Sequence, residues 1–103
     1  DYLQVEHVLS PGVVENLSKT LWPDHEDPQL CDLVHCYAKG ISELDEMVRK
    51  MIFEELGIFE KYWDEHKTST TIAFAMLHYG MPKADGANLR LPPHTDKRVT
   101  TIL

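Results

Sequence analysis

The sequence has little of what marks several large classes of protein. Cysteine occurs only twice among 103 residues, at Cys31 and Cys36. On a helix this spacing points the two thiols to different faces, which favours neither a disulfide nor a zinc pair. No apolar run approaches the roughly 18 residues that a membrane span needs, and no secretory signal is visible. We therefore expect reduced thiols, no membrane partner and a cytoplasmic location.

Basic side chains are also scarce. Ten Lys and Arg residues are interspersed with seventeen Asp and Glu residues, which gives a net charge of −7. Nucleic-acid binding needs clustered Lys and Arg to meet the phosphates, so we expect no nucleic-acid partner. Hydrophobic residues make up 43% of the chain and charged residues 26%, a composition that supports a packed core.

Both ends of the chain favour the interpretation that it is an internal piece of a longer protein. It starts at Asp1 and stops within the run Val99–Leu103. That run is β-branched and apolar, as in a strand, and a strand needs a partner strand beside it.

A long helix is predicted from Pro28 to Leu56, because apolar residues recur there at gaps of three and four. Asp27 is suited to cap its first turn, with Pro28 at the first helical position, and Gly57 is suited to end it. We expect one face of this helix to pack on the rest of the chain, namely Leu33, Tyr37, Leu44 and Met51.

The remaining elements are shorter. Apolar spacing predicts helices over Val13–Leu21 and Phe59–His66. Helices followed by strands without alternation indicate an α+β fold. β-Forming residues favour an extended piece over Leu3–Val8 and strands over Thr68–Tyr79 and Leu91–Leu103, with a loop over Gly80–Asn88.

The triplet His94–Thr95–Asp96 is the candidate for metal chemistry. Side chains alternate across a strand, so His94 and Asp96 would share one face and Thr95 would point away. An imidazole and a carboxylate supply two of the three ligands of the triad that holds ferrous iron. The spacing alone also fits a surface pair, and it recurs at His25–Asp27, where Asp27 is already explained as a helix cap.

Four segments in order resemble the plant soluble 2-oxoglutarate-dependent dioxygenases, nearest to the group that modifies glucosinolate side chains. They are Thr20–Asp24, Ile41–Ile52, Lys61–His66 and Leu91–Lys97. The resemblance extends from about Leu21 to Leu103, which is most of the chain.

This resemblance implies a double-stranded β-helix, or jelly roll, wrapped by N-terminal helices. Residues 1–66 would be the helical region and 67–103 the start of an incomplete jelly-roll domain. His94 and Asp96 would be iron ligands, and Tyr79 would hold the distal carboxylate of 2-oxoglutarate. The family's second histidine and its Arg-x-Ser pair would lie downstream.

The resemblance also implies an activity: oxidation of a small-molecule metabolite with Fe(II), 2-oxoglutarate and O2, with ascorbate a further candidate. Hydroxylation, desaturation and side-chain cleavage all stay open, and we expect a monomer at full length. The chain departs from many relatives at Leu77, where they carry asparagine, and at Ala75, where an arginine often stands. The alternatives are an inactive truncated paralogue acting as a helical interaction module, and a different metal-binding jelly roll such as a cupin.

Overall fold

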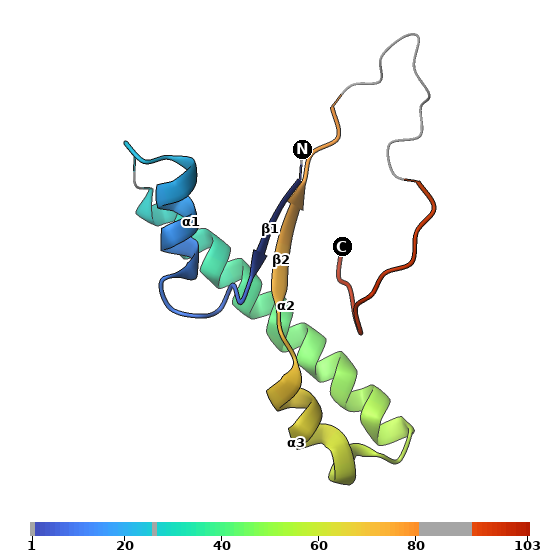
Figure 1. Ribbon diagram of the computed structural model, residues 1–103. Helices are drawn as coiled ribbons and strands as arrows, with labels where there is room; N and C mark the ends of the chain where they lie inside the picture. The colour runs from blue at the N-terminus through green and yellow to red at the C-terminus, as the bar shows by residue number, and fades with distance from the viewer. Residues whose placement is uncertain (1, 26, 81–91) are drawn as a thin grey trace.

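The computed structural model describes residues 2–25, 27–80 and 92–103. Figure 1 shows the long helix α2 as the axis of the molecule, with α1 near one end, α3 along the other, and a two-stranded sheet crossing between them. The α+β mixture is confirmed, although a strand precedes the helices. In chain order the elements are β1 (Tyr2–Glu6), α1 (Val13–Leu21), α2 (Pro28–Glu55), α3 (Phe59–Ser69) and β2 (Ala73–Leu77).

Helix α2 begins as the sequence predicts. The Asp27 Oδ1 atom accepts hydrogen bonds from the backbone N–H groups of Gln29, at 3.0 Å, and Leu30, at 3.2 Å. Pro28 follows at the first helical position, where its missing N–H is not needed. The acid in the His25–Asp27 triplet is therefore a structural cap.

Helix α2 also ends at the predicted place. Gly57 adopts a φ of 67°, a left-handed conformation that glycine takes without steric cost. Its N–H donates to the Glu54 carbonyl, and the Ile58 N–H donates to the Phe53 carbonyl, both at 3.0 Å. These two bonds satisfy carbonyls that the helix end would otherwise leave unpaired.

The sheet joins the start of the chain to its middle. Strands β1 and β2 pair antiparallel, from Tyr2 opposite Leu77 to Glu6 opposite Ala73. Below them lies a small core that β1, α1 and α2 share with the turn after β1. Its buried members are Val5, Val8, Val14 and Ala38, with Phe74, Val34 and Leu17 among the partly buried residues around them.

The predicted apolar face of α2 is not covered by the described residues. Leu33, Tyr37, Leu44 and Met51 are 66, 54, 48 and 54% exposed, so the expectation that this face packs on the rest of the chain is wrong here. Of these four residues, Tyr37 meets Phe74 of β2 edge-on at 5.9 Å between ring centres, while the buried residues of α2 are Ala38 and Arg49.

The boundary between α3 and β2 lies later than the sequence predicts. Thr68 and Ser69, expected in the strand, extend the helix beyond His66. Their hydroxyls donate to helix carbonyls, Thr68 to Asp64 at 2.7 Å and Ser69 to His66 at 3.2 Å. These local bonds let two weak helix formers remain in the last turn, and β2 begins only at Ala73.

The predicted strand over Leu91–Leu103 is a second correction. Residues 92–103 are irregular throughout, while Leu91 and most of the predicted loop at Gly80–Asn88 lie outside the described residues. The local sequence favours a strand, but a strand forms only when a neighbour receives its backbone hydrogen bonds. Among the described residues β1 and β2 bond to each other, and neither pairs with this segment.

Two further expectations concern the cysteines and a membrane span. Cys31 and Cys36 both lie on α2 and are free thiols, one partly buried and one exposed. Within the described ranges, no helix combines the length and the apolar character needed to cross a bilayer.

Candidate functional site

His94 and Asp96 lie close together although their backbone is not a strand. The His94 Nε2 atom is 3.3 Å from the Asp96 Oδ1 atom, and the two side chains are 50 and 57% exposed. The irregular backbone thus brings together two donor groups that the sequence placed on one face of a strand.

The Pro92 carbonyl lies beside one ring nitrogen of His94. The His94 Nδ1 atom lies 3.0 Å from the Pro92 carbonyl oxygen. A carbonyl only accepts, so the Nδ1–H group donates, and in the neutral ring the Nε2 lone pair then points at Asp96. A proton or a metal ion placed between these two atoms, which lie 3.3 Å apart, would contact both of them.

The spacing of these two atoms fits a metal. Adjacent ligands of an octahedral ion with bonds of about 2.1 Å lie about 3.0 Å apart, close to the observed separation. The second carboxylate oxygen of Asp96, Oδ2, accepts a hydrogen bond from the Thr101 hydroxyl at 3.3 Å. Hydrogen bonding of the far oxygen is a common feature of ligating carboxylates. An imidazole nitrogen and a carboxylate oxygen are both donor types that divalent cations such as Fe(II) accept.

The other predicted site parts are not gathered around this pair. Within residues 2–25, 27–80 and 92–103, no group of three or more His, Cys, Asp and Glu side chains is placed to hold a metal ion. Tyr79 stands two residues after the end of β2 and is 50% exposed. No hydrogen bond among the described residues links it to His94 or Asp96. The structure thus places the two predicted ligands together, whereas within the described part of the chain no hydrogen bond or ion pair joins Tyr79 to them.

A shallow depression on α3 offers no alternative site for a carboxylate co-substrate. Its lining is acidic and hydroxylic, from Asp64, Glu65, Thr68 and Ser69. It lies on a different element from His94 and Asp96, and a dianion such as 2-oxoglutarate would meet carboxylates there.

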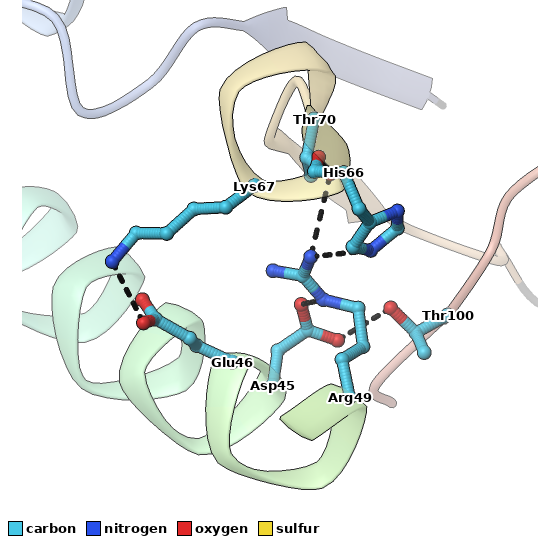
Figure 2. Close-up of polar contacts among 7 residues, drawn as sticks. All are labelled: Asp45, Glu46, Arg49, His66, Lys67, Thr70 and Thr100. Atoms are coloured by element: carbon cyan, nitrogen blue, oxygen red, sulfur yellow. Dashed lines mark hydrogen bonds and ion pairs between the residues drawn. The ribbon is translucent and has the colours of Figure 1, made fainter. Parts of the chain in front are cut away.

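The least exposed charged group in the described chain is Arg49 of α2, which is 5% exposed. Its Nε atom donates to Asp45 Oδ2 at 2.7 Å, and its Nη1 atom donates to His66 Nε2 at 2.9 Å (Figure 2). A guanidinium only donates, so His66 Nε2 is the acceptor. A third bond, of 3.3 Å, joins Nη1 to the Thr70 hydroxyl. These partners offset the cost of burying the positive charge.

An aromatic ring lies over this charge and packs with two further rings. The Arg49 guanidinium lies 6.0 Å from the centre of the Trp63 ring, which is itself 7% exposed. Phe53 packs edge-on against Trp63 at 5.6 Å between ring centres and against the His66 ring at 4.7 Å. We refer to Asp45, Arg49, Trp63, His66 and Thr70 together as the α2–α3 junction.

The junction also touches the segment that carries the candidate ligands. Asp45 has a second oxygen, Oδ1, which accepts a hydrogen bond from the Thr100 hydroxyl (Figure 2). This group of residues was not predicted from the sequence. The available signal was the spacing of Asp45 and Arg49, an acid four residues before a base on a helix, but burial of the pair depends on α3 folding back over it.

An exposed pair beside the junction behaves differently. Lys67 of α3 donates to Glu46 Oε1 of α2 at 2.8 Å, and both side chains remain substantially exposed. The hydrogen bond from Lys67 and its positive charge lower the pKa of the Glu46 carboxyl below its usual 4.5. This pair is a surface contact between the same two helices.

The chain is similar to curated plant proteins. It is 40% identical over 94 residues to a protein of Arabidopsis thaliana named probable 2-oxoglutarate-dependent dioxygenase AOP1, covering 87% of this chain and 31% of the relative. It is 32% identical over 93 residues to 2-oxoglutarate-dependent dioxygenase AOP2 of the same plant, covering 86% and 21%. A protein named probable inactive 2-oxoglutarate-dependent dioxygenase AOP2 is 33% identical over 70 residues, covering 64% and 17%.

These matches confirm the resemblance on which the sequence analysis relied. The chain spans about a third or less of the length of the curated relatives it matches. No protein-family model matches it, and no solved structure is significantly similar to it.

Proposed function

We propose that this chain, a relative of the plant 2-oxoglutarate-dependent dioxygenases of the AOP group, forms part of an Fe(II)- and 2-oxoglutarate-dependent dioxygenase that oxidises a small-molecule metabolite. The observation that carries the proposal is the 3.3 Å approach of His94 Nε2 to Asp96 Oδ1 in a chain related to enzymes of this name. The proposal includes a jelly roll that starts within residues 67–103, with residues 1–66 as its helical flank.

In this proposal, two residues hold the metal and two others orient them. His94 and Asp96 would hold the metal through Nε2 and Oδ1. The Pro92 carbonyl keeps the His94 proton on Nδ1, and Thr101 occupies the far oxygen of Asp96. Bound Fe(II), with 2-oxoglutarate and O2, would supply the oxidising chemistry, which the protein alone lacks.

Tyr79 is proposed to bind the co-substrate. Its phenol can donate a hydrogen bond to the distal carboxylate of 2-oxoglutarate, and its 50% exposure leaves the hydroxyl accessible. Leu77 and Ala75 stand where many relatives carry an asparagine and an arginine, and neither side chain can donate a hydrogen bond. The hydrogen bond from Tyr79 would therefore be a larger share of the contacts to the distal carboxylate. We further propose a monomeric, cytoplasmic protein whose reaction is hydroxylation, desaturation or side-chain cleavage.

The proposal is tested by replacing Asp96 in the protein that carries this sequence. Asp96→Ala should abolish succinate formation from 2-oxoglutarate and weaken Fe(II) binding. The melting temperature should stay unchanged, because this exposed side chain contributes little packing. Asp96→Glu should also fail, since moving the carboxylate by about 1 Å can cost roughly a hundredfold in rate. Normal turnover by Asp96→Ala would show that the iron site lies elsewhere.

The name of one relative, probable inactive 2-oxoglutarate-dependent dioxygenase AOP2, favours a second candidate, a catalytically inactive paralogue. Such a protein would keep the fold and form no succinate with any metabolite supplied. Uncoupled succinate formation, measured with Fe(II) and 2-oxoglutarate alone, separates the two candidates because it needs no knowledge of the substrate.

A further inference from the structure

The segment that carries the candidate ligands is held to the rest of the molecule at few places. Of residues 92–103, only Thr100 is partly buried, and all the others are exposed. Arg98 reaches Glu6 of β1 at 3.9 Å, but both side chains are about half exposed, and such pairs contribute little. The position of the segment therefore depends on what Thr100 contacts.

Thr100 contacts a carboxylate that is part of a largely buried ion pair. Its hydroxyl donates to Asp45 Oδ1, while the other oxygen of the same carboxylate is bonded to the buried Arg49 at 2.7 Å. The Asp45 side chain is 17% exposed and that of Arg49 is 6% exposed. A carboxylate fixed on one oxygen by a buried guanidinium presents the other oxygen in a defined direction.

The next residue points the other way. The Thr101 hydroxyl donates to Asp96 Oδ2 at 3.3 Å, and Asp96 Oδ1 faces His94 Nε2 at 3.3 Å. Two adjacent hydroxyls thus bond to two different carboxylates, one on α2 and one in the ligand pair. Because consecutive Cα atoms lie only about 3.8 Å apart, fixing Thr100 limits the distance over which Thr101 can move.

We propose that Thr100 and Thr101 form a two-hydroxyl clamp that positions Asp96 for metal binding by anchoring its segment to the Asp45–Arg49 ion pair. Both are positioning residues, since each hydroxyl donates to a carboxylate, Thr100 to Asp45 and Thr101 to Asp96. The inference rests on the proposed function, because it takes His94 and Asp96 as ligands.

The clamp is tested with isosteric replacements in the protein that carries this sequence. Thr100→Val and Thr101→Val each remove one hydroxyl and keep the shape of the side chain, whereas Thr100→Ser and Thr101→Ser keep the hydroxyl. Cobalt(II) serves as the probe, with its affinity followed by absorption and the melting temperature followed in parallel. The matched control is Thr20→Val, which removes the hydroxyl bonded to the Asn16 carbonyl on α1.

Both valine variants should bind cobalt(II) about tenfold more weakly, the loss typical of partners that orient metal ligands. The serine variants should restore the affinity to within about twofold, and Thr20→Val should not change it. Melting temperatures should fall no further in the Thr100 and Thr101 variants than in Thr20→Val.

Two outcomes would overturn the clamp. One is cobalt(II) affinity in Thr100→Val and Thr101→Val equal to that of the unchanged protein, while His94→Ala and Asp96→Ala lose it; the proposed function would then stand. The other is a serine variant as impaired as its valine counterpart, which would assign the loss to packing. If His94→Ala and Asp96→Ala bind cobalt(II) normally, the proposed metal site fails and the clamp fails with it.

Discussion

The α2–α3 junction and the segment 92–103 differ in almost every physical respect. In the junction, Arg49 and Trp63 are 5 and 7% exposed, and the guanidinium has three hydrogen-bond partners. In the segment, His94 and Asp96 are half exposed and the backbone is irregular. The contrast indicates that the contacts that stabilise the fold and the groups proposed for chemistry lie in different parts of the chain, linked through Asp45.

The largest effect on stability should come from Asp45→Ala. It leaves the buried Arg49 without its carboxylate partner, and breaking such a pair from one side costs about 3 kcal/mol of unfolding free energy. Urea denaturation followed by circular dichroism measures this loss. The double variant Asp45→Ala/Arg49→Met should regain much of it, because no unpaired charge remains. If Asp45→Ala were as stable as the unchanged protein, the α2–α3 junction would not be a main source of the stability of the fold.

The next effect concerns function alone. Tyr79→Phe removes one hydrogen bond to a charged carboxylate, with a value of about 1.5–3 kcal/mol. The KM for 2-oxoglutarate should therefore rise roughly ten- to a hundredfold, with Fe(II) affinity and melting temperature unchanged. Tyr62→Phe, on exposed α3 surface, is the matched control and should leave the KM unaltered. A change in Fe(II) affinity in Tyr79→Phe would contradict the assigned role.

A smaller effect should be confined to stability. Asp27→Ala removes the carboxylate that accepts two backbone N–H groups at the start of α2, at a cost of about 1 kcal/mol. Turnover and metal affinity should not change, although His25–Asp27 has the same spacing as the candidate ligands. Asp27→Asn should retain most of the stability. Loss of activity in Asp27→Ala would mean that the wrong triplet was chosen.

The smallest effect is the pH dependence of the exposed Glu46–Lys67 pair. Because the folded state lowers the Glu46 pKa below 4.5, the ionised form stabilises the fold above that pH, and the contribution disappears as pH falls through the lowered value. Glu46→Gln should therefore melt slightly below the unchanged protein at pH 7 and at the same temperature in strong acid. Added salt should shrink the difference. A difference in melting temperature that grew in acid would contradict the stabilisation expected from the lowered Glu46 pKa.

The helices were predictable because their determinants are local. Asp27, Pro28 and Gly57 define both ends of α2 within a few residues of sequence, and α1 occupies the predicted range. The strand predicted over Leu91–Leu103 failed because its formation depends on a neighbour. The burial of Arg49 could not be predicted either, since it requires Trp63 and His66 to fold back from α3. The spacing of His94 and Asp96 was enough to predict a candidate ligand pair. The contact that anchors their segment, from Thr100 to Asp45, spans 55 positions and could not be predicted from local sequence.

The sheet has a kinetic consequence for Tyr79. Tyr2 pairs with Leu77, so all three helices lie inside the loop that the two strands close. Closing a loop of this length costs roughly 4 kcal/mol of chain entropy before any pairing compensates for it. Helices form within about a microsecond, whereas distant strand pairing is slower. We therefore expect α2 to form first and β2 to dock last. Tyr79 follows β2 by two residues, so its position would be fixed only after β2 has docked.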